Sequence, residues 1–181
     1  MGIREIRNMI STQQNNNELV QRTVQRALQM LNDREPPAKI LSLLVETAEG
    51  IAGNDSVCSI LLLDKTGLLR NCCSPKLPFD YLTAIDGLKP DPNLGTCAAA
   101  AATGCMVITK DFKSDDKWAE LRHLPLALGF AGAWSMPVKT ENGEILGTFG
   151  TYFIENREPS EEEVSAVRQF AGVVATVLAQ A

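Results

Sequence analysis

The sequence predicts an α+β fold, with a central, largely antiparallel β-sheet, flanking helices and a helical extension at the N-terminus. Three observations lead to this prediction. Apolar residues recur at helical spacing in the first third of the chain, alternating apolar runs separated by turn residues follow, and a capped helix comes last. The 181 residues suit one domain with an appended helix, because a second full domain would need more chain.

Two helices are expected in the N-terminal third. The first spans residues 18–32 after a polar break at residues 13–17, and the second opens at Pro36 and Pro37 and stops at Gly53. Their apolar stripes consist of Leu19, Val20, Val24, Leu28 and Leu31 in the first helix, and Ile40, Leu41, Leu43, Leu44, Ala48 and Ile51 in the second. Neither helix has the propensity to stand alone, so each must pack on another element.

Short strands and helices are expected to alternate through the middle of the chain. Apolar runs at residues 56–64 and 68–74 flank a polar turn and indicate a hairpin. Thr96 suits an N-cap, and Gly104 a stop signal, for the alanine-rich helix between them. The other elements expected here are a short helix at 78–86, a strand at 106–111 and a helix at 118–128 that Gly129 closes.

A hairpin and a long helix are expected at the C-terminal end. Residues 133–140 and 144–155 alternate around Asn142-Gly143, the strongest two-residue hairpin signal. Ser160 and Glu163 have the spacing of a capping box. The helix that they open keeps its apolar positions at helical spacing to the end, with Val164, Val167, Phe170, Val173, Val174 and Val177.

Charge and residue content argue against several classes of function. The net charge is −5 and no segment clusters Lys and Arg with aromatic residues, so nucleic-acid binding is not expected. No stretch is apolar enough to span a bilayer and the N-terminus lacks the core of a secretory signal, so we expect a cytoplasmic protein with no membrane partner. Five cysteines and one His suit neither a closed disulfide framework nor a metal site.

The second half of the chain carries an ordered series of short motifs. They are Gly95-Thr96-Cys97 with Ala98, residues 107–111, Asp115-Asp116-Lys117-Trp118, Trp134-Ser135-Met136-Pro137-Val138, residues 143–152 and residues 159–163. This series resembles the GAF domain family, whose fold is PAS-like. The resemblance starts near residue 38, so it implies an N-terminal helical extension at residues 1–36 and a GAF domain at residues 37–181.

Departures from the family pattern narrow what the resemblance implies. Ala98 stands where the family often has Gly, which changes how closely the backbone can be approached at that helix start. The Asn-Lys-x-Phe-x-Asp-Glu signature of cyclic-nucleotide-binding members is missing. The Cys-His attachment pair of bilin-binding members is also missing, because Arg122 precedes His123.

The resemblance implies a ligand pocket between the sheet and the short helices, drawn mainly from residues 79–134. The candidate lining residues are Leu94, Cys97, Asp111, Trp118, Leu121, His123, Trp134 and Tyr152. Trp118 and Trp134 would give apolar walls with one N–H donor each, although core packing is the commoner role of such residues. Asp111 also fits a turn-forming carboxylate, and His123 a surface residue.

The function implied by the resemblance is that of a cytoplasmic sensory domain. It would bind an unidentified small molecule and relay its state through flanking helices that pair in a homodimer, acting on a separate effector protein or within a longer chain. A ligand-free dimerisation or protein-interaction module stays open as the alternative. The sequence identifies no cofactor.

An enzyme is not expected, because the chain has no nucleophile elbow, no phosphate-cradling Gly loop and a single His. Two further family activities stay open. One is a bilin-binding photoreceptor domain. The other is a free methionine sulfoxide reductase, whose clustered cysteines would here come from Cys72, Cys73, Cys97 and Cys105.

Overall fold

A five-stranded sheet, in the order β2-β1-β5-β4-β3, forms the centre of the computed structural model, which describes residues 2–53 and 55–180 but not the side chains of residues 6 and 8. The strands are β1 Val57–Leu63, β2 Leu69–Cys73, β3 Val107–Thr109, β4 Gly132–Lys139 and β5 Ile145–Phe153. Every neighbouring pair is antiparallel. The predicted α+β fold with an antiparallel sheet is therefore confirmed. The predicted domain limits include residues 1 and 181, which lie outside the described residues.

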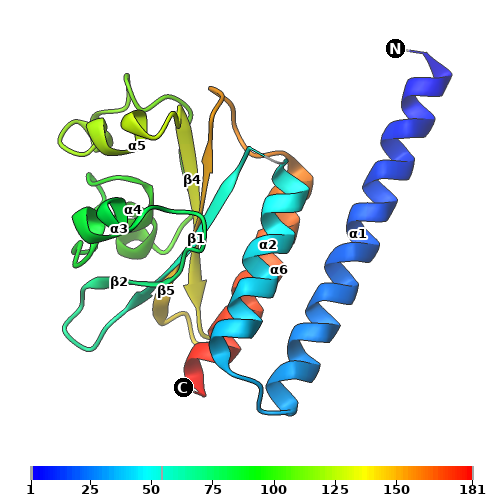
Figure 1. Ribbon diagram of the computed structural model, residues 1–181, viewed down its shortest axis with the longest axis horizontal. Coiled ribbons are helices and arrows are strands. Elements are labelled where there is room, and N and C mark those ends of the chain that lie inside the picture. Colours follow the sequence, from blue (N-terminus) through cyan, green and yellow to red (C-terminus); the bar gives the residue numbers. More distant parts are fainter. Residues whose placement is uncertain (1, 54, 181) are drawn as a thin grey trace.

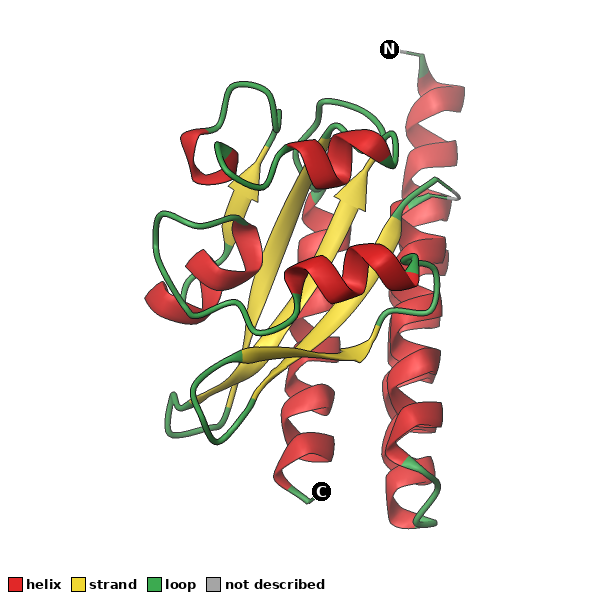
Figure 2. Ribbon diagram, turned by 60° about the vertical axis from the view of Figure 1, so that its left-hand side comes forward, coloured by secondary structure: helices red, strands yellow, loops and turns green. Residues whose placement is uncertain are grey.

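Helices cover both faces of this sheet (Figures 1 and 2). The long helices α1 Ile3–Asn32, α2 Pro37–Ala52 and α6 Glu161–Ala179 lie on one side, with α2 and α6 directly on the sheet and α1 outside them. On the other side lie the short elements α3 Phe79–Ile85, α4 Thr96–Thr103, η1 Asp116–Trp118 and α5 His123–Ala127. Within the described part of the chain, no helix combines the length and apolar character that crossing a bilayer requires.

Helix α1 runs without interruption through residues 13–17, where the sequence predicted a break. Gln and Asn do not constrain the backbone as Pro does, so a polar run does not end a helix. Two of the polar residues of α1 instead bond to α6: Asn16 Nδ2 donates to Glu162 at 2.9 Å and Gln21 Nε2 donates to Gln169 at 2.8 Å. Beyond Asn16 toward the N-terminus, every described side chain is exposed, and α1 projects past the ends of α2 and α6 (Figure 1).

The buried face of α1 is also rotated from the predicted stripe. Val20, Thr23 and Ala27 are buried, whereas Leu19 and Leu28 are exposed. The helix packs into the groove between α2 and α6, and small or β-branched side chains let it approach closely there. The sequence pattern alone did not separate these residues from the leucines beside them.

Two of the predicted helix ends are confirmed and one predicted cap is wrong. Ser160 Oγ accepts from the Glu163 amide at 3.2 Å, and the Glu163 carboxylate accepts from the Ser160 amide at 2.7 Å, which is the expected capping box. Gly104 ends α4 in the left-handed region with φ 64°. At the start of α4, however, the N-cap is Gly95 with φ 58°, and Thr96 is the first helical residue. The Thr96 hydroxyl bonds to the sheet instead, as described below.

Two further elements differ from prediction. The helix predicted at 118–128 is divided into η1 and α5, because Pro125 has no N–H to bond the carbonyl of Leu121 in a continuous helix and is tolerated only in the first turn of α5. The hairpin around Asn142-Gly143 forms, but its loop is longer than two residues. The Thr140 amide donates to the Glu144 carbonyl, and Gly143 adopts a left-handed φ of 85° after the turn.

Candidate functional site

A narrow cavity lies between the sheet and the short helices, on the face that Figure 2 turns toward the reader. The space open to the centre of a water molecule is about 20 Å³. Its walls come from β1, β5, α3, α4 and the segments around α4 and η1: Leu61, Tyr81, Ile85, Leu88, Leu94, Gly95, Thr96, Cys97, Ala98, Trp118, Leu121 and Tyr152. No charged side chain is among these residues.

Small polar side chains of the sheet lie beneath α4, beside this cavity. Ser59, Ser135 and Gly150 are neighbours on the three central strands and face the same side. A Cβ on Gly150 would lie 3.1 Å from the Cys97 sulfur, 3.2 Å from Ser59 Oγ and 3.3 Å from Ser135 Oγ. The absence of a side chain at residue 150 therefore allows α4 to pack this closely on the sheet.

Cys97 joins α4 to these sheet hydroxyls. Its sulfur lies 3.1 Å from Ser135 Oγ, and Ser135 Oγ in turn donates to Thr96 Oγ1 at 3.0 Å. Burial raises the pKa of the Cys97 thiol despite these contacts, so the thiol stays protonated at neutral pH. Ser59 Oγ and Thr148 Oγ1 are buried and have no hydrogen-bond partner among the described residues; Thr148 lies near the Cys97 sulfur, but outside hydrogen-bonding geometry.

Two buried tyrosines, Tyr81 and Tyr152, line the cavity. The Tyr81 hydroxyl of α3 donates to the Tyr152 hydroxyl of β5 at 3.0 Å, and the rings meet edge to face with centroids 5.9 Å apart. Burial raises the pKa of both phenols above the ordinary value, so both stay neutral. The cavity thus offers hydroxyl groups but no charge.

Trp118 is held against the cavity by a short polar chain. Its indole N–H donates to Thr109 Oγ1 at 3.1 Å, and the Thr109 hydroxyl donates to Asp115 Oδ2 at 2.7 Å. Lys117 completes the chain with an ion pair to Asp115 at 2.8 Å. Although partial burial acts in the opposite direction, the hydrogen bonds from Lys117 and Thr109 lower the pKa of Asp115. This network fixes the orientation of the indole ring.

The structure brings most of the predicted pocket residues together. Leu94, Cys97, Trp118, Leu121 and Tyr152 line the cavity. Asp111, His123 and Trp134 lie elsewhere. Asp111 accepts from the Lys113 amide in a turn at 2.9 Å, and His123 is exposed at the start of α5. Trp134 faces the opposite side of the sheet and packs under the long helices. Ligand contact by any of these residues stays a prediction.

Sequence reasoning missed several wall residues, above all Tyr81, Ile85 and Leu61. Tyr81 and Ile85 are four residues apart in α3, so one face of that short helix carries both. Leu61 follows Ser59 on the cavity face of β1 by strand alternation. The spacing was visible in the sequence, but nothing in it indicated which face of β1 the short helices would cover.

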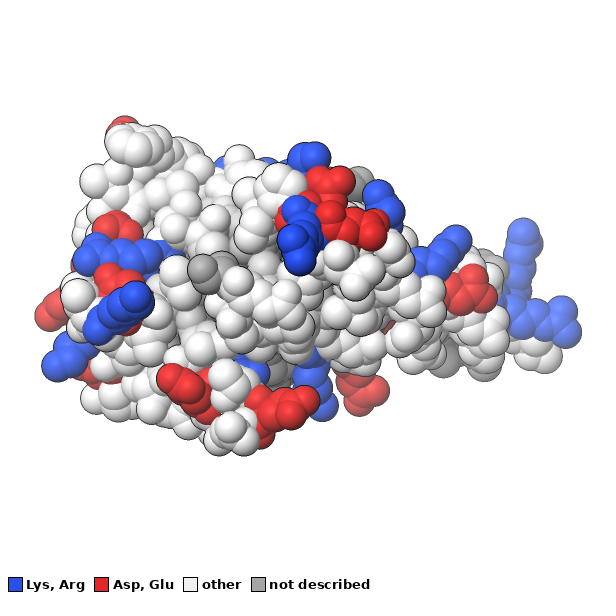
Figure 3. Space-filling model, turned by 90° about the horizontal axis from the view of Figure 1, so that it is seen from below, with Lys and Arg blue, Asp and Glu red and all other residues white. Residues whose placement is uncertain are grey.

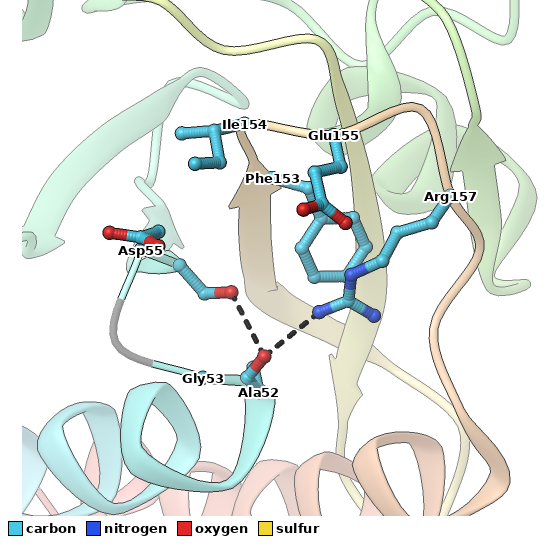
Figure 4. A pocket seen from close by; sticks show the side chains of 8 residues that line it. Ala52, Gly53, Asp55, Phe153, Ile154, Glu155 and Arg157 are labelled. Atoms are coloured by element: carbon cyan, nitrogen blue, oxygen red, sulfur yellow. Dashed lines mark hydrogen bonds between the residues drawn. The ribbon is translucent and has the colours of Figure 1, made fainter.

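A second hollow lies between the end of α2 and the end of β5 (Figure 4), and about 120 Å³ of it is open to the centre of a water molecule. Arg157 lines this hollow. The central carbon of its guanidinium lies 3.5 Å from the centroid of the Phe153 ring, and the guanidinium donates to the Ala52 carbonyl at 2.9 Å. Arg157 also bonds both carboxylate oxygens of Glu163 at 2.8 and 3.0 Å. Because its cation is already bonded on several sides, this hollow is a structural junction between α2, β5 and α6.

The surface charges and the potential metal ligands are dispersed. On the face shown in Figure 3, Lys and Arg side chains alternate with Asp and Glu between large uncharged areas. Among the described residues, no group of three or more His, Cys, Asp or Glu side chains could hold a metal ion. The described cysteines are all free, and Cys72 and Cys73 lie on β2 at the edge of the sheet, apart from the cavity.

Comparison with known proteins gives consistent matches. A family model described as GAF domain matches residues 35–179. The methyl sulfide methyltransferase-associated sensor of Methanosarcina acetivorans is 35% identical over 132 residues, which are 72% of this chain but only 13% of that protein. The chain therefore spans a small part of its relative.

Two solved structures show the same fold at low identity. A GAF domain from a phosphoenolpyruvate-protein phosphotransferase of Coxiella burnetii superposes with a TM-score of 0.70 at 19% identity, covering 89% of this chain and 93% of that chain. The free methionine-R-sulfoxide reductase of Neisseria meningitidis, in complex with its substrate, gives 0.67 at 12% identity, covering 91% and 88%.

Proposed function

The chain belongs to the GAF domain family, and from this premise we propose that it is a sensory domain that binds a small molecule in the cavity between the sheet and the short helices. A relative named as a sensor supports the sensory role. The observation that carries the proposal is the cavity itself, which is lined by apolar walls and a few hydroxyl groups, as small-molecule sites usually are. Binding would favour one arrangement of cavity and flanking helices over another.

Native mass spectrometry of the purified protein, with a denaturing control, tests this proposal. We expect a bound mass that is lost on denaturation. The Leu94→Trp variant should lose it because the larger ring fills the cavity, whereas Leu128→Trp, at an exposed site outside the cavity, should keep it. A bound mass that both variants retain equally would place the ligand elsewhere and contradict the proposal.

Pairing of two copies through the long helices is a second candidate function. The projecting end of α1 exposes Ile3, Met9 and Ile10, with relative exposures of 75%, 60% and 50%, and no other described element covers them (Figure 1). A homodimer would bury them and would relay a change in the cavity through α1 and α6.

Light scattering at micromolar concentration should show a dimer. Ile3→Gln/Ile10→Gln should make it a monomer, whereas Leu128→Gln should leave it a dimer. A monomeric wild-type protein would contradict this.

We expect no catalysis of the reductase type. That chemistry needs reactive thiolates close together. Cys97 is the one cysteine among the residues that line the cavity, and burial raises the pKa of its thiol, so it stays protonated. A thiol-dependent assay with free methionine sulfoxide tests this expectation. Turnover that Cys97→Ser abolishes would make the protein an enzyme.

A further inference from the structure

The two tyrosines of the cavity have two O–H donors but form one described hydrogen bond, so one donor is left over. Each phenol carries one O–H donor. Tyr81 donates to Tyr152, but neither hydroxyl has another hydrogen-bond partner among the described residues, so the Tyr152 proton has no acceptor. Both side chains are buried, with relative exposures of 4% for Tyr81 and 3% for Tyr152. A buried donor without an acceptor is destabilising, and an incoming acceptor would remove that cost.

The walls of the cavity exclude charge. Besides the phenols, the lining consists of aliphatic side chains, the Trp118 ring, the Thr96 hydroxyl and the neutral Cys97 thiol. Two ionised groups beside Trp118, Asp115 and Lys117, are bonded to each other. An ion entering the cavity would lose its hydration without meeting an opposite charge, which is strongly unfavourable.

The cavity also limits the size of its occupant. A space of about 20 Å³ for the centre of a water molecule admits a solute of only a few heavy atoms. Leu88, Leu94 and Leu121 are half-buried and form its outer wall. Their side chains favour an apolar body on the molecule that passes between them.

From these three observations we propose that the cavity selects a small, uncharged molecule with an apolar body and one hydrogen-bond acceptor, which takes the spare proton of the Tyr81–Tyr152 pair. This inference rests on the proposed function, because it assumes that the cavity binds a ligand. It adds the chemical class of that ligand, and it excludes anions, nucleotides and amino acids from this site.

Three probes of nearly equal size and shape test the requirement for no charge and the requirement for an acceptor separately: acetone, acetate ion and isobutene. Each has four heavy atoms, but only acetone is both neutral and an acceptor. Methyl NMR of the full chain, with labelled Leu and Ile, would follow Ile85, Leu94 and Leu121 during titration at millimolar concentration. We expect saturable shifts with acetone and isobutene, and none with acetate.

Variants of the tyrosines then test the hydrogen bond. In Tyr81→Phe or Tyr152→Phe the remaining phenol still has one free proton, so each single variant should bind acetone within about twofold of wild type. The double variant Tyr81→Phe/Tyr152→Phe has no phenol, and its acetone affinity should fall roughly threefold to tenfold. Isobutene affinity should stay within about twofold, which also shows that the double variant is folded with its cavity intact.

Several results would overturn the inference, and they differ from failure of the proposed function. Isobutene binding without acetone binding, equal acetone affinity in the double variant, or acetate shifts as large as those of acetone would each refute the ligand class and leave a binding cavity in place. If none of the probes shifts these methyls and the native mass is empty, the cavity is filled by water or by nothing, and both proposals fail.

Discussion

Phe149 and Gly150 are adjacent on β5, and they show how differently the two faces of the sheet are built. Phe149 points toward α2 and α6, is fully buried and belongs to a cluster with Trp134 and Phe170. Gly150 points toward α4, where it leaves room for the Cys97 sulfur and two serine hydroxyls. At these two positions, β5 supplies a large ring to one face and leaves space on the other.

This difference would separate folding stability from the proposed ligand binding within a single sheet. The face under the long helices is packed with large apolar side chains, and their burial is the main source of folding free energy. The face under the short helices has a smaller cluster of its own around Phe112 and Tyr152, and beneath α4 it contains small residues, a cavity and two buried hydroxyls that lack a hydrogen-bond partner among the described residues. We expect the part beneath α4 to contribute less to stability and to be the part that accepts the proposed ligand. Substitutions at matched positions on the two faces test this division.

The largest effect is expected at Phe149. Phe149→Ala removes a fully buried ring from the packed face and should lower the free energy of unfolding by about 3–5 kcal/mol. Ser135→Ala, on the cavity face of neighbouring β4, loses its bonds to Cys97 and Thr96 and should cost only about 1 kcal/mol. Urea denaturation measures both values. Equal losses would mean that the two faces contribute alike.

A smaller effect is expected at Gly150. In Gly150→Ala the new methyl group would lie 3.1 Å from the Cys97 sulfur and must displace α4 slightly, at a cost of about 1–3 kcal/mol. The same change at Gly172 on α6 meets no atom within 4 Å and removes a helix-interior glycine. It should therefore stabilise the protein by about 0.5–1 kcal/mol. Thermal unfolding should move in opposite directions in the two variants.

Removing the two tyrosine hydroxyls is expected to have the smallest effect on stability at neutral pH. Their effect on stability becomes measurable at alkaline pH. The pKa of each phenol is raised in the folded state, so its contribution to stability is fully present below the ordinary pKa of 10.0 and is lost as pH rises above it. The melting temperature should fall steeply above pH 10, and less steeply in Tyr81→Phe/Tyr152→Phe. Parallel curves for the two proteins would show that these phenols do not titrate on unfolding.

The elements governed by local chemistry could be predicted from the sequence. Ser160 and Glu163 determine where α6 begins, and Gly104 determines where α4 ends, through bonds within a few residues. The errors arose where one residue overrides a pattern, as Pro125 does in dividing the predicted helix, or where tertiary contact continues an element. Residues 13–17 stay helical as part of α1, which bonds to α6 over more than 140 residues of sequence.

The site could be predicted only in part, for a physical reason. Motif residues such as Cys97 and Trp118 stand at fixed places in the family pattern, so the resemblance identified them. Tyr81 belongs to no such motif, and its role depends on meeting Tyr152, which is 71 residues away. Trp134 was assigned to the pocket region although strand alternation relative to Ser135 turns it to the other face. Assigning the faces requires the sheet register.

Helix α1 extends well beyond the residues that bond it to α6 (Figure 1). Asn16 bonds to Glu162 in the first turn of α6, and the next residue, Glu163, is held by Arg157, whose guanidinium lies over the Phe153 ring at the end of β5. From Asn16 the projecting part of α1 extends about 20 Å at 1.5 Å per residue. A tilt of about 10° at this fulcrum would move the tip by about 3 Å. A small tilt near Asn16 would therefore become a larger displacement at the N-terminal end of α1, which lies outside α2 and α6 (Figure 1).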